Sequence, residues 1–304
     1  GTFTFTPGNG TVIFNATDTD NTIASGGKSF KNVDFNGADG GWTLQDSFIT
    51  TGDFTVTRTD TTGNGVNLAG NSLSVGGNFI LGNGAFGAKV TTGASAISAS
   101  GNWTIGTNGT FVSTGSTVTF NATDGDNTIR SNARSFGNVT FNGAGGVWSL
   151  QDSLDVNGNI TITTGTLDVV SDENTIFVSG NWVREGGVFQ QRSGSVILDG
   201  VNQTISGSNV FYNLKKDTTS VAILTFPAQE TQMISGEMFL KGRLGAVLTL
   251  RSSDPLALNP QDRWWIIDPT GTREVDYLSV EDSYNPGASI DCRGFNSSGN
   301  GNTI

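Results

Sequence analysis

An aspartate-asparagine phrase occurs twice in this chain, at a spacing that could bind a metal ion. FNATDTDNTI (14–23) returns as FNATDGDNTI (120–129). Because Ca²⁺ prefers carboxylate and carbonyl oxygens, the phrase supplies four calcium-ligand candidates: Asp18, Asp20, Asp124 and Asp126. The full calcium loop with its distal Glu is missing, however, and Asp and Asn also bond to their own backbone in turns. We therefore prefer the turn interpretation, which needs no cofactor, and keep calcium as the alternative.

A second group of residues could bind a sugar. The segment QDRWW (261–265) is the densest mixture of acidic, basic and aromatic residues in the sequence. Indole rings can form a shelf for a sugar ring, which makes the glycan-site candidates Asp262, Arg263, Trp264 and Trp265. A tryptophan in a terminal coil more often closes the core, and we prefer that interpretation.

Enzymatic roles are difficult to fill from this composition. The 304 residues contain no His, which removes the commonest general base. It also removes the Gly-His-Gly segment by which polygalacturonase-like enzymes resemble one another. A lyase could use Arg or Lys as its base, but the basic residues are scattered, and Lys215 and Lys216 form the only Lys pair. We therefore expect a protein that is not an enzyme, with no catalytic or cofactor-binding residue.

Charge and hydropathy exclude further classes of function. The formal net charge is -11 and the pI is about 4.3, so no basic surface is available for phosphates, and we expect no nucleic-acid partner. The longest apolar runs, such as VAILTF (221–226), are too short for a membrane span. The single Cys292 excludes an internal disulfide.

The sequence contains an internal repeat, and this repeat predicts the secondary structure on which the candidate residues lie. A shift of 106 residues aligns 12–57 with 118–163 without a gap, and about 28 of the 46 aligned pairs are identical. A third, decayed copy starts near residue 195. A shorter phrase, glycine-asparagine-aromatic, recurs at Gly77, Gly101 and Gly180. Recurrence of this kind predicts a repeat architecture.

Short alternating runs inside the repeat, such as TVTF (117–120), recur about every 21 residues. They predict an all-β fold, a right-handed parallel β-helix (β-solenoid) of about 14 coils of roughly 21 residues, with five coils in each repeat unit. Residues 1–245 then form the repeat solenoid, and 246–304 form atypical C-terminal coils that continue it. Equivalent residues should stack in an internal aromatic ladder, namely Phe14 on Phe35 and Phe120 on Phe141, with Trp42 and Trp148 facing the same core.

Several longer phrases resemble a known class of proteins. STVTFNATDGDNTI, FGNVTFNGAGGVWSLQDSLDVNGNITITTGTL and the closing DRWWIIDPTGTREVDYLSVEDS are similar to repeat-rich bacterial secreted or cell-surface proteins of the β-solenoid adhesin type, which resemble autotransporter passengers. The likeness covers nearly the whole chain. It implies an extracellular or cell-surface location and a non-catalytic role as a filament subunit, stalk or adhesin. The alternative is a polysaccharide-binding or polysaccharide-processing β-helix protein with a surface glycan as its partner.

The two ends of the sequence suggest self-association. GTFTFTPGNGTVIF (1–14) opens on strand residues like those of GTFVSTGSTVTF (109–120), and GNGNTI (299–304) closes on a turn phrase, with no capping helix at either end. Uncapped coils expose backbone groups that favour pairing with another strand. We expect end-to-end association, or contact with neighbouring parts of a longer chain, through Thr2, Phe3, Thr4, Phe5, Asn302 and Ile304.

Overall fold

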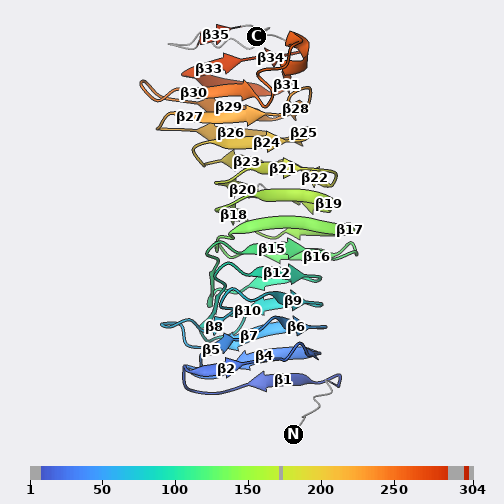
Figure 1. The fold of residues 1–304 in the computed structure, drawn as a ribbon, viewed down its shortest axis with the longest axis vertical. Helices are drawn as coiled ribbons and strands as arrows, with labels where there is room; N and C mark the ends of the chain where they lie inside the picture. Colours follow the sequence, from blue (N-terminus) through green and yellow to red (C-terminus); the bar gives the residue numbers. More distant parts are fainter. Residues whose placement is uncertain (1–7, 171–173, 287–297, 301–304) are drawn as a thin grey trace. The chain divides into compact units, whose positions relative to one another are not determined.

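The computed structural model describes residues 8–170, 174–286 and 298–300, and its fold is an all-β parallel β-solenoid of about 12 turns. The fold class predicted from the repeat is therefore confirmed. The chain divides into two compact units, residues 1–155 with 164–166 and residues 156–163 with 167–304. Figure 1 shows the strands of each unit stacked in chain order. Each unit is described by itself.

Unit 1 is built from three ladders of parallel strands, and each coil adds one strand to each ladder. The first ladder holds β1 (Thr11–Phe14), β4 (Asn32–Asn36), β7 (Phe54–Arg58), β10 (Phe79–Leu81), β13 (Trp103–Ile105) and β16 (Asn127–Arg130). The second holds β3 (Ser29–Phe30), β6 (Phe48–Thr50), β9 (Leu73–Val75), β12 (Ala96–Ala99) and β15 (Thr117–Phe120). The third holds β2 (Asn21–Ile23), β5 (Trp42–Leu44), β8 (Val66–Asn67), β11 (Ala88–Thr91) and β14 (Gly109–Val112). The long strand β17 (Asn138–Leu150) pairs with both β15 and β16.

Two strands, β18 (Leu154–Val156) and β19 (Ile160–Asp168), contain residues of both units. Unit 2 continues with one ladder of β21 (Trp182–Arg184), β24 (Gln203–Ser206), β27 (Ala222–Phe226), β30 (Leu248–Ser252), β33 (Leu278–Glu281) and β35 (Ser298–Asn300). A second ladder holds β20 (Thr175–Val178), β23 (Ser195–Leu198), β26 (Asn213–Asp217), β29 (Glu237–Lys241) and β32 (Thr272–Asp276). A third holds β25 (Asn209–Phe211), β28 (Thr231–Ile234), β31 (Trp265–Pro269) and β34 (Ser283–Tyr284). The short β22 (Val188–Gln190) and the 3₁₀ turn η1 (Pro260–Arg263) complete the described elements.

The core of unit 1 is an aromatic ladder, as the repeat predicts. Phe14 stacks on Phe35 with ring centroids 4.9 Å apart, and the equivalent pair in the second copy, Phe120 and Phe141, stacks at 5.3 Å. Trp148 is fully buried in the same core. Strands such as TVTF alternate between half-buried and buried residues, because successive side chains point to opposite faces of a strand. The predicted stacking is therefore confirmed in both copies.

The coils are fewer and less regular than predicted. Thr11 pairs with Asn32, which is 21 residues further on, whereas Thr231 pairs with Ile266, which is 35 residues further on. Fourteen strands, β1 to β14, precede the start of the second copy at β15, and with three strands in each coil this is not a whole number of coils. The prediction of five coils in each repeat unit is therefore wrong, and about 12 turns replace the predicted 14.

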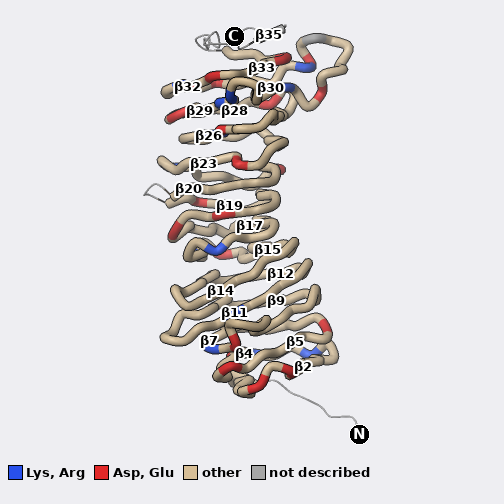
Figure 2. The backbone as a smooth tube through the Cα atoms, turned by 90° about the vertical axis from the view of Figure 1, so that its left-hand side faces the viewer, with Lys and Arg blue, Asp and Glu red and all other residues tan. Residues whose placement is uncertain are grey.

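The boundary predicted at residue 245 stays a prediction. The strand that follows it, β30, pairs with β27 before the boundary and with β33 after it. Figure 2 shows that acidic and basic residues are sparse along the backbone of both units. No helix in residues 8–170, 174–286 and 298–300 has the length and apolar character needed to cross a membrane.

Candidate assembly face and other candidate sites

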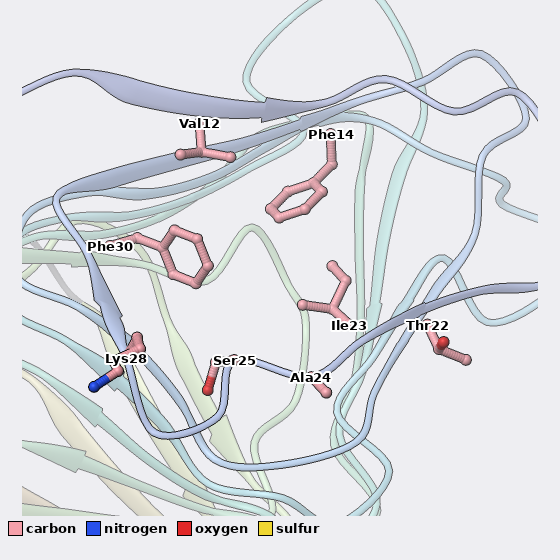
Figure 3. A pocket seen from close by; sticks show the side chains of 8 residues that line it. All are labelled: Val12, Phe14, Thr22, Ile23, Ala24, Ser25, Lys28 and Phe30. Carbon is pink, nitrogen blue, oxygen red and sulfur yellow. The ribbon is translucent and has the colours of Figure 1, made fainter. Parts of the chain in front are cut away.

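The first described coil of unit 1 has a hollow over part of its apolar core. A hollow of about 370 Å³ lies between β1, β2 and β3 and is lined by Val12, Phe14, Ile23 and Phe30, with polar or small residues at its rim. Figure 3 shows Phe14, Ile23 and Phe30 directed into the hollow and Lys28 directed away from it. We call this surface the end face.

The second repeat copy shows how the same surface looks when a coil covers it. The counterparts of Val12 and Phe14 are Val118 and Phe120, and both are fully buried, whereas Val12 and Phe14 are only half-buried. Trp103, from the coil before, lies 5.9 Å from Phe120 between ring centroids. It also packs at 5.5 Å on Phe136, the counterpart of Phe30, which Phe111 approaches to 5.8 Å. The repeat thus provides a fully buried form of this surface and a form in which Val12 and Phe14 are only half-buried.

The strand edges at the end face are also open. Within the described part of unit 1, β1 pairs only with β4, β2 only with β5 and β3 only with β6. In the second copy, β15 and β16 have a partner strand on each side. Unpaired edges over an apolar surface favour the addition of another strand. The end face therefore presents both the backbone groups and the apolar side chains that strand addition requires.

The repeated aspartate-asparagine phrase forms a turn in both copies. The Asn21 side-chain amide donates to the Asp18 carboxylate at 2.6 Å and to the Asp18 carbonyl at 2.8 Å. Asn127 makes the same bonds to Asp124, at 2.6 Å and 3.1 Å. The remaining carboxylate of each phrase, at residues 20 and 126, is exposed. Among the described residues, no three His, Cys, Asp or Glu side chains come together as a metal site would require.

Removal of metal ions tests the turn interpretation. Excess chelator is expected to leave the melting temperature unchanged, because the carboxylates of Asp18 and Asp124 are already bonded within their own turns. Thermal unfolding followed by circular dichroism, with and without chelator, measures this. A clear fall in melting temperature that added Ca²⁺ reverses would show that calcium binds the folded chain, and would support the alternative.

The structure separates the four residues of the predicted sugar shelf. Trp265 is buried, stacks on Phe226 at 4.1 Å, and donates from its indole nitrogen to the carbonyl of Glu281. Trp264 is half-buried and stacks on Tyr284 at 5.1 Å. The other two candidates bond within their own surroundings, Asp262 with Gln229 and Arg263 with a backbone carbonyl of the preceding loop. The two indoles therefore do not form one exposed shelf.

The only Lys pair also divides between core and surface. Lys216 is fully buried, and its ammonium donates to Gly200 O at 2.7 Å and to Gln203 Oε1 at 2.6 Å. Burial lowers the pKa of Lys216 to about 8, although the charge of Asp199 opposes this shift. Lys215 lies on the surface beside Glu237, 2.5 Å away. An enclosed Lys216 cannot touch a polysaccharide, so it is unsuited to act as a lyase base.

One residue of the repeated LQD motif has a role that the sequence reading missed. The Asp46 carboxylate accepts hydrogen bonds from the backbone amides of Ser25 at 2.8 Å and Gly26 at 2.7 Å, in the turn of the coil before. These bonds, that of Ser25 first, hold the pKa of Asp46 below its usual value. Asp152 binds the equivalent two amides at 2.8 Å and 2.6 Å. The repetition of LQD was the available signal, and the motif joins neighbouring coils.

The asparagine of the glycine-asparagine-aromatic phrase forms hydrogen bonds between neighbouring coils. Asn78 Oδ1 accepts from the amide of Asn102 at 2.9 Å, and Asn102 Oδ1 accepts from the amide of Thr128 at 2.7 Å. In unit 2, Asn181 Oδ1 accepts from the amide of Thr204 at 2.8 Å. The aromatic residue that follows each Asn is buried. The phrase thus places a polar bond at the strand start and an aromatic ring in the core.

The six residues predicted to mediate assembly, Thr2, Phe3, Thr4, Phe5, Asn302 and Ile304, lie outside the described residues. The end face is formed by β1, β2 and β3, which follow the four N-terminal residues of this set in the sequence.

Fold and sites together define the class of the protein, a repeat-containing parallel β-solenoid whose first described coil has an open apolar face. Comparison with models of known protein families, with curated proteins and with solved structures found no match.

Proposed function

We propose that this chain is a non-catalytic structural β-solenoid that acts outside a bacterial cell, as a filament subunit or a surface stalk or adhesin, and associates end to end with other copies. One observation carries the proposal. Among the described residues no strand covers Val12 and Phe14 of the end face, which are half-buried, whereas their counterparts Val118 and Phe120 are fully buried beneath a coil that contributes Trp103. The location rests on the resemblance of the repeat phrases to bacterial surface proteins.

The last described strands of unit 2 supply surfaces for the other half of such a contact. Among the described residues, β32 pairs only with β29 and β35 only with β33. A contact between two different ends is heterologous, so it propagates into a filament unless a rotation closes a ring. The proposed partner of the end face is therefore the last coil of another copy.

The distribution of the Trp residues favours a structural role over polysaccharide binding. A binder of glycan chains needs aromatic rings along an exposed face. Five Trp residues are buried in this chain, at positions 42, 103, 148, 182 and 265, and only Trp264 is half-buried. Polysaccharide binding or processing stays the alternative, with Trp264 and Tyr284 as its remaining candidate site.

A charge placed on the end face tests the proposal. Val12→Asp is expected to abolish concentration-dependent association, because covering the face would then bury an unpaired carboxylate. Val12 is half-buried, so the folded monomer should tolerate the change. Sedimentation velocity over a range of protein concentrations measures the association, and circular dichroism checks the fold.

Val201→Asp is the matched control, since Val201 is 55% exposed and is not one of the residues that line the end face. This variant should associate like the parent chain. Equal association of the Val12 variant and the parent would contradict the proposal, as would a parent chain that stays monomeric at every concentration.

A further inference from the structure

Unit 2 has a second hollow, of about 240 Å³, on the outward side of its strands. It lies on the ladder of β23, β26 and β29, which follow one another in Figure 2. Five of its six lining residues are half-buried or exposed, and only Leu198 is buried. The lining residues are Ile197, Leu198, Asp199, Lys215, Asp217 and Phe239.

Part of this hollow is apolar and aromatic. Ile197 pairs with Lys215, and Lys215 pairs with Phe239, so the three side chains form one outward column across three coils. Ile197 and Phe239 are both half-buried. An aromatic ring beside an aliphatic side chain offers a surface on which the CH groups of a ligand can pack.

Two carboxylates, those of Asp199 and Asp217, also line the hollow. The Ser179 hydroxyl donates to Asp199 at 2.8 Å, and the Arg243 guanidinium donates to Asp217 at 2.7 Å. These bonds hold both carboxylates in place. A carboxylate has about four lone-pair sites, so both can accept further hydrogen bonds from a ligand.

Ion pairs neutralise most of the charge around the hollow. Lys215 pairs with Glu237 at 2.5 Å, and Asp217 pairs with Arg243. Asp199 forms no ion pair among the described residues, although the charge of the buried Lys216 attracts it. The chain as a whole has a net charge of -11, so an anionic ligand would be repelled.

A neutral sugar in its pyranose form matches this combination. Its ring carries CH groups that pack on an aromatic side chain, and its hydroxyls donate to carboxylates. Pockets for drug-sized molecules measure roughly 300–1,000 Å³. A hollow of about 240 Å³ is therefore suited to a single sugar ring.

We infer that this hollow binds one neutral pyranose ring, such as the terminal sugar of a glycan. Ile197 and Phe239 pack against the ring, and Asp199 and Asp217 accept hydrogen bonds from its hydroxyls. The site is separate from Trp264, which does not line the hollow. The inference goes beyond the proposed end-to-end association and does not depend on it.

Saturation-transfer NMR on the full chain tests the inference with the methyl glycosides of glucose, galactose and mannose. At least one of them is expected to bind, and a titration gives its Kd. Phe239→Ala should raise that Kd at least about threefold, because the packing of the sugar on the ring is lost. Asp199→Ala should raise it about tenfold, because a hydrogen bond to a charged group is lost. Circular dichroism checks the fold of both variants.

Phe86→Ala is the matched control for the Phe239 variant. Phe86 also has a cation over its ring, Arg58 at 4.3 Å, as Phe239 has Lys241 at 4.7 Å, but Phe86 does not line the hollow. This variant should keep the Kd of the parent chain. The inference would be overturned if none of the three glycosides bound, or if the Phe239 and Asp199 variants both kept the parent Kd.

The charge of the ligand is tested with the uronic acid that corresponds to the sugar that binds. Its methyl glycoside is expected to bind more weakly, because it adds a carboxylate to an acidic chain. Equal or tighter binding of the uronic acid would overturn the assignment of a neutral sugar. Val12→Asp, which alters the end face, should leave the Kd for the sugar unchanged, so this measurement and the association measurement can fail separately.

Discussion

Replacing Trp148 by Ala is expected to lower the free energy of unfolding by about 3–5 kcal/mol. Trp148 is fully buried, and its ring packs on Phe141 at 5.6 Å and on Phe120 at 6.2 Å between centroids. Its removal leaves a cavity in the aromatic ladder, and each coil of a solenoid depends on its neighbours for burial. Denaturant unfolding followed by circular dichroism measures the change.

Trp264→Ala is the matched control for this substitution. Trp264 is half-buried and its ring stacks on that of Tyr284, which is half-buried too, so its removal should cost clearly less than the removal of Trp148. An unchanged stability of the Trp148 variant would place this ring outside the core and would contradict the ladder.

Gly143→Ala is expected to cost about 1–3 kcal/mol or more, although it adds only one methyl group. A Cβ at Gly143 would overlap the carbonyl oxygen of Ala122 in the coil before, and the backbone atoms there cannot move away as a flexible side chain could. Gly37, the equivalent residue in the first copy, has the same overlap with the carbonyl oxygen of Ala16. The repeated FNG phrase therefore records a close approach of two backbones.

Gly125→Ala provides the control in the same repeat copy. No atom lies within 4 Å of a Cβ at Gly125, so this variant should keep the stability of the parent chain within about 0.5 kcal/mol. Comparison of the two melting curves is sufficient. Equal stability of the Gly143 and Gly125 variants would show that the coils are spaced more widely at Gly143 than described.

The sequence predicted the fold class because the repeat and the short alternating runs each allow few architectures. The stacking of Phe120 on Phe141 followed directly, since equivalent residues of neighbouring coils must meet. The number of coils did not follow. Spacing between apolar residues reports strand positions, whereas loop length varies independently, as the 35 residues from Thr231 to Ile266 show.

The candidate sites were less predictable than the fold. Adjacent residues of an extended segment point to opposite sides, so the two indoles of QDRWW could not both face the core. Nothing in the sequence indicated that Trp265 would be the buried one and Trp264 the half-buried one. The role of Asp46 depends on its contact with Ser25 in the coil before, and such a contact between coils has no local sequence signal. The end face required both repeat copies, since only their comparison shows that Phe14 is half-buried where its counterpart Phe120 is fully buried.

Electron microscopy of the purified full chain tests end-to-end association most directly. Negatively stained images over a range of protein concentrations should show particles that lengthen at constant width, since each added copy covers the end face of another. The Val12→Asp variant, prepared in parallel, should show only short particles. Short particles of uniform length in the parent chain at every concentration would contradict the account.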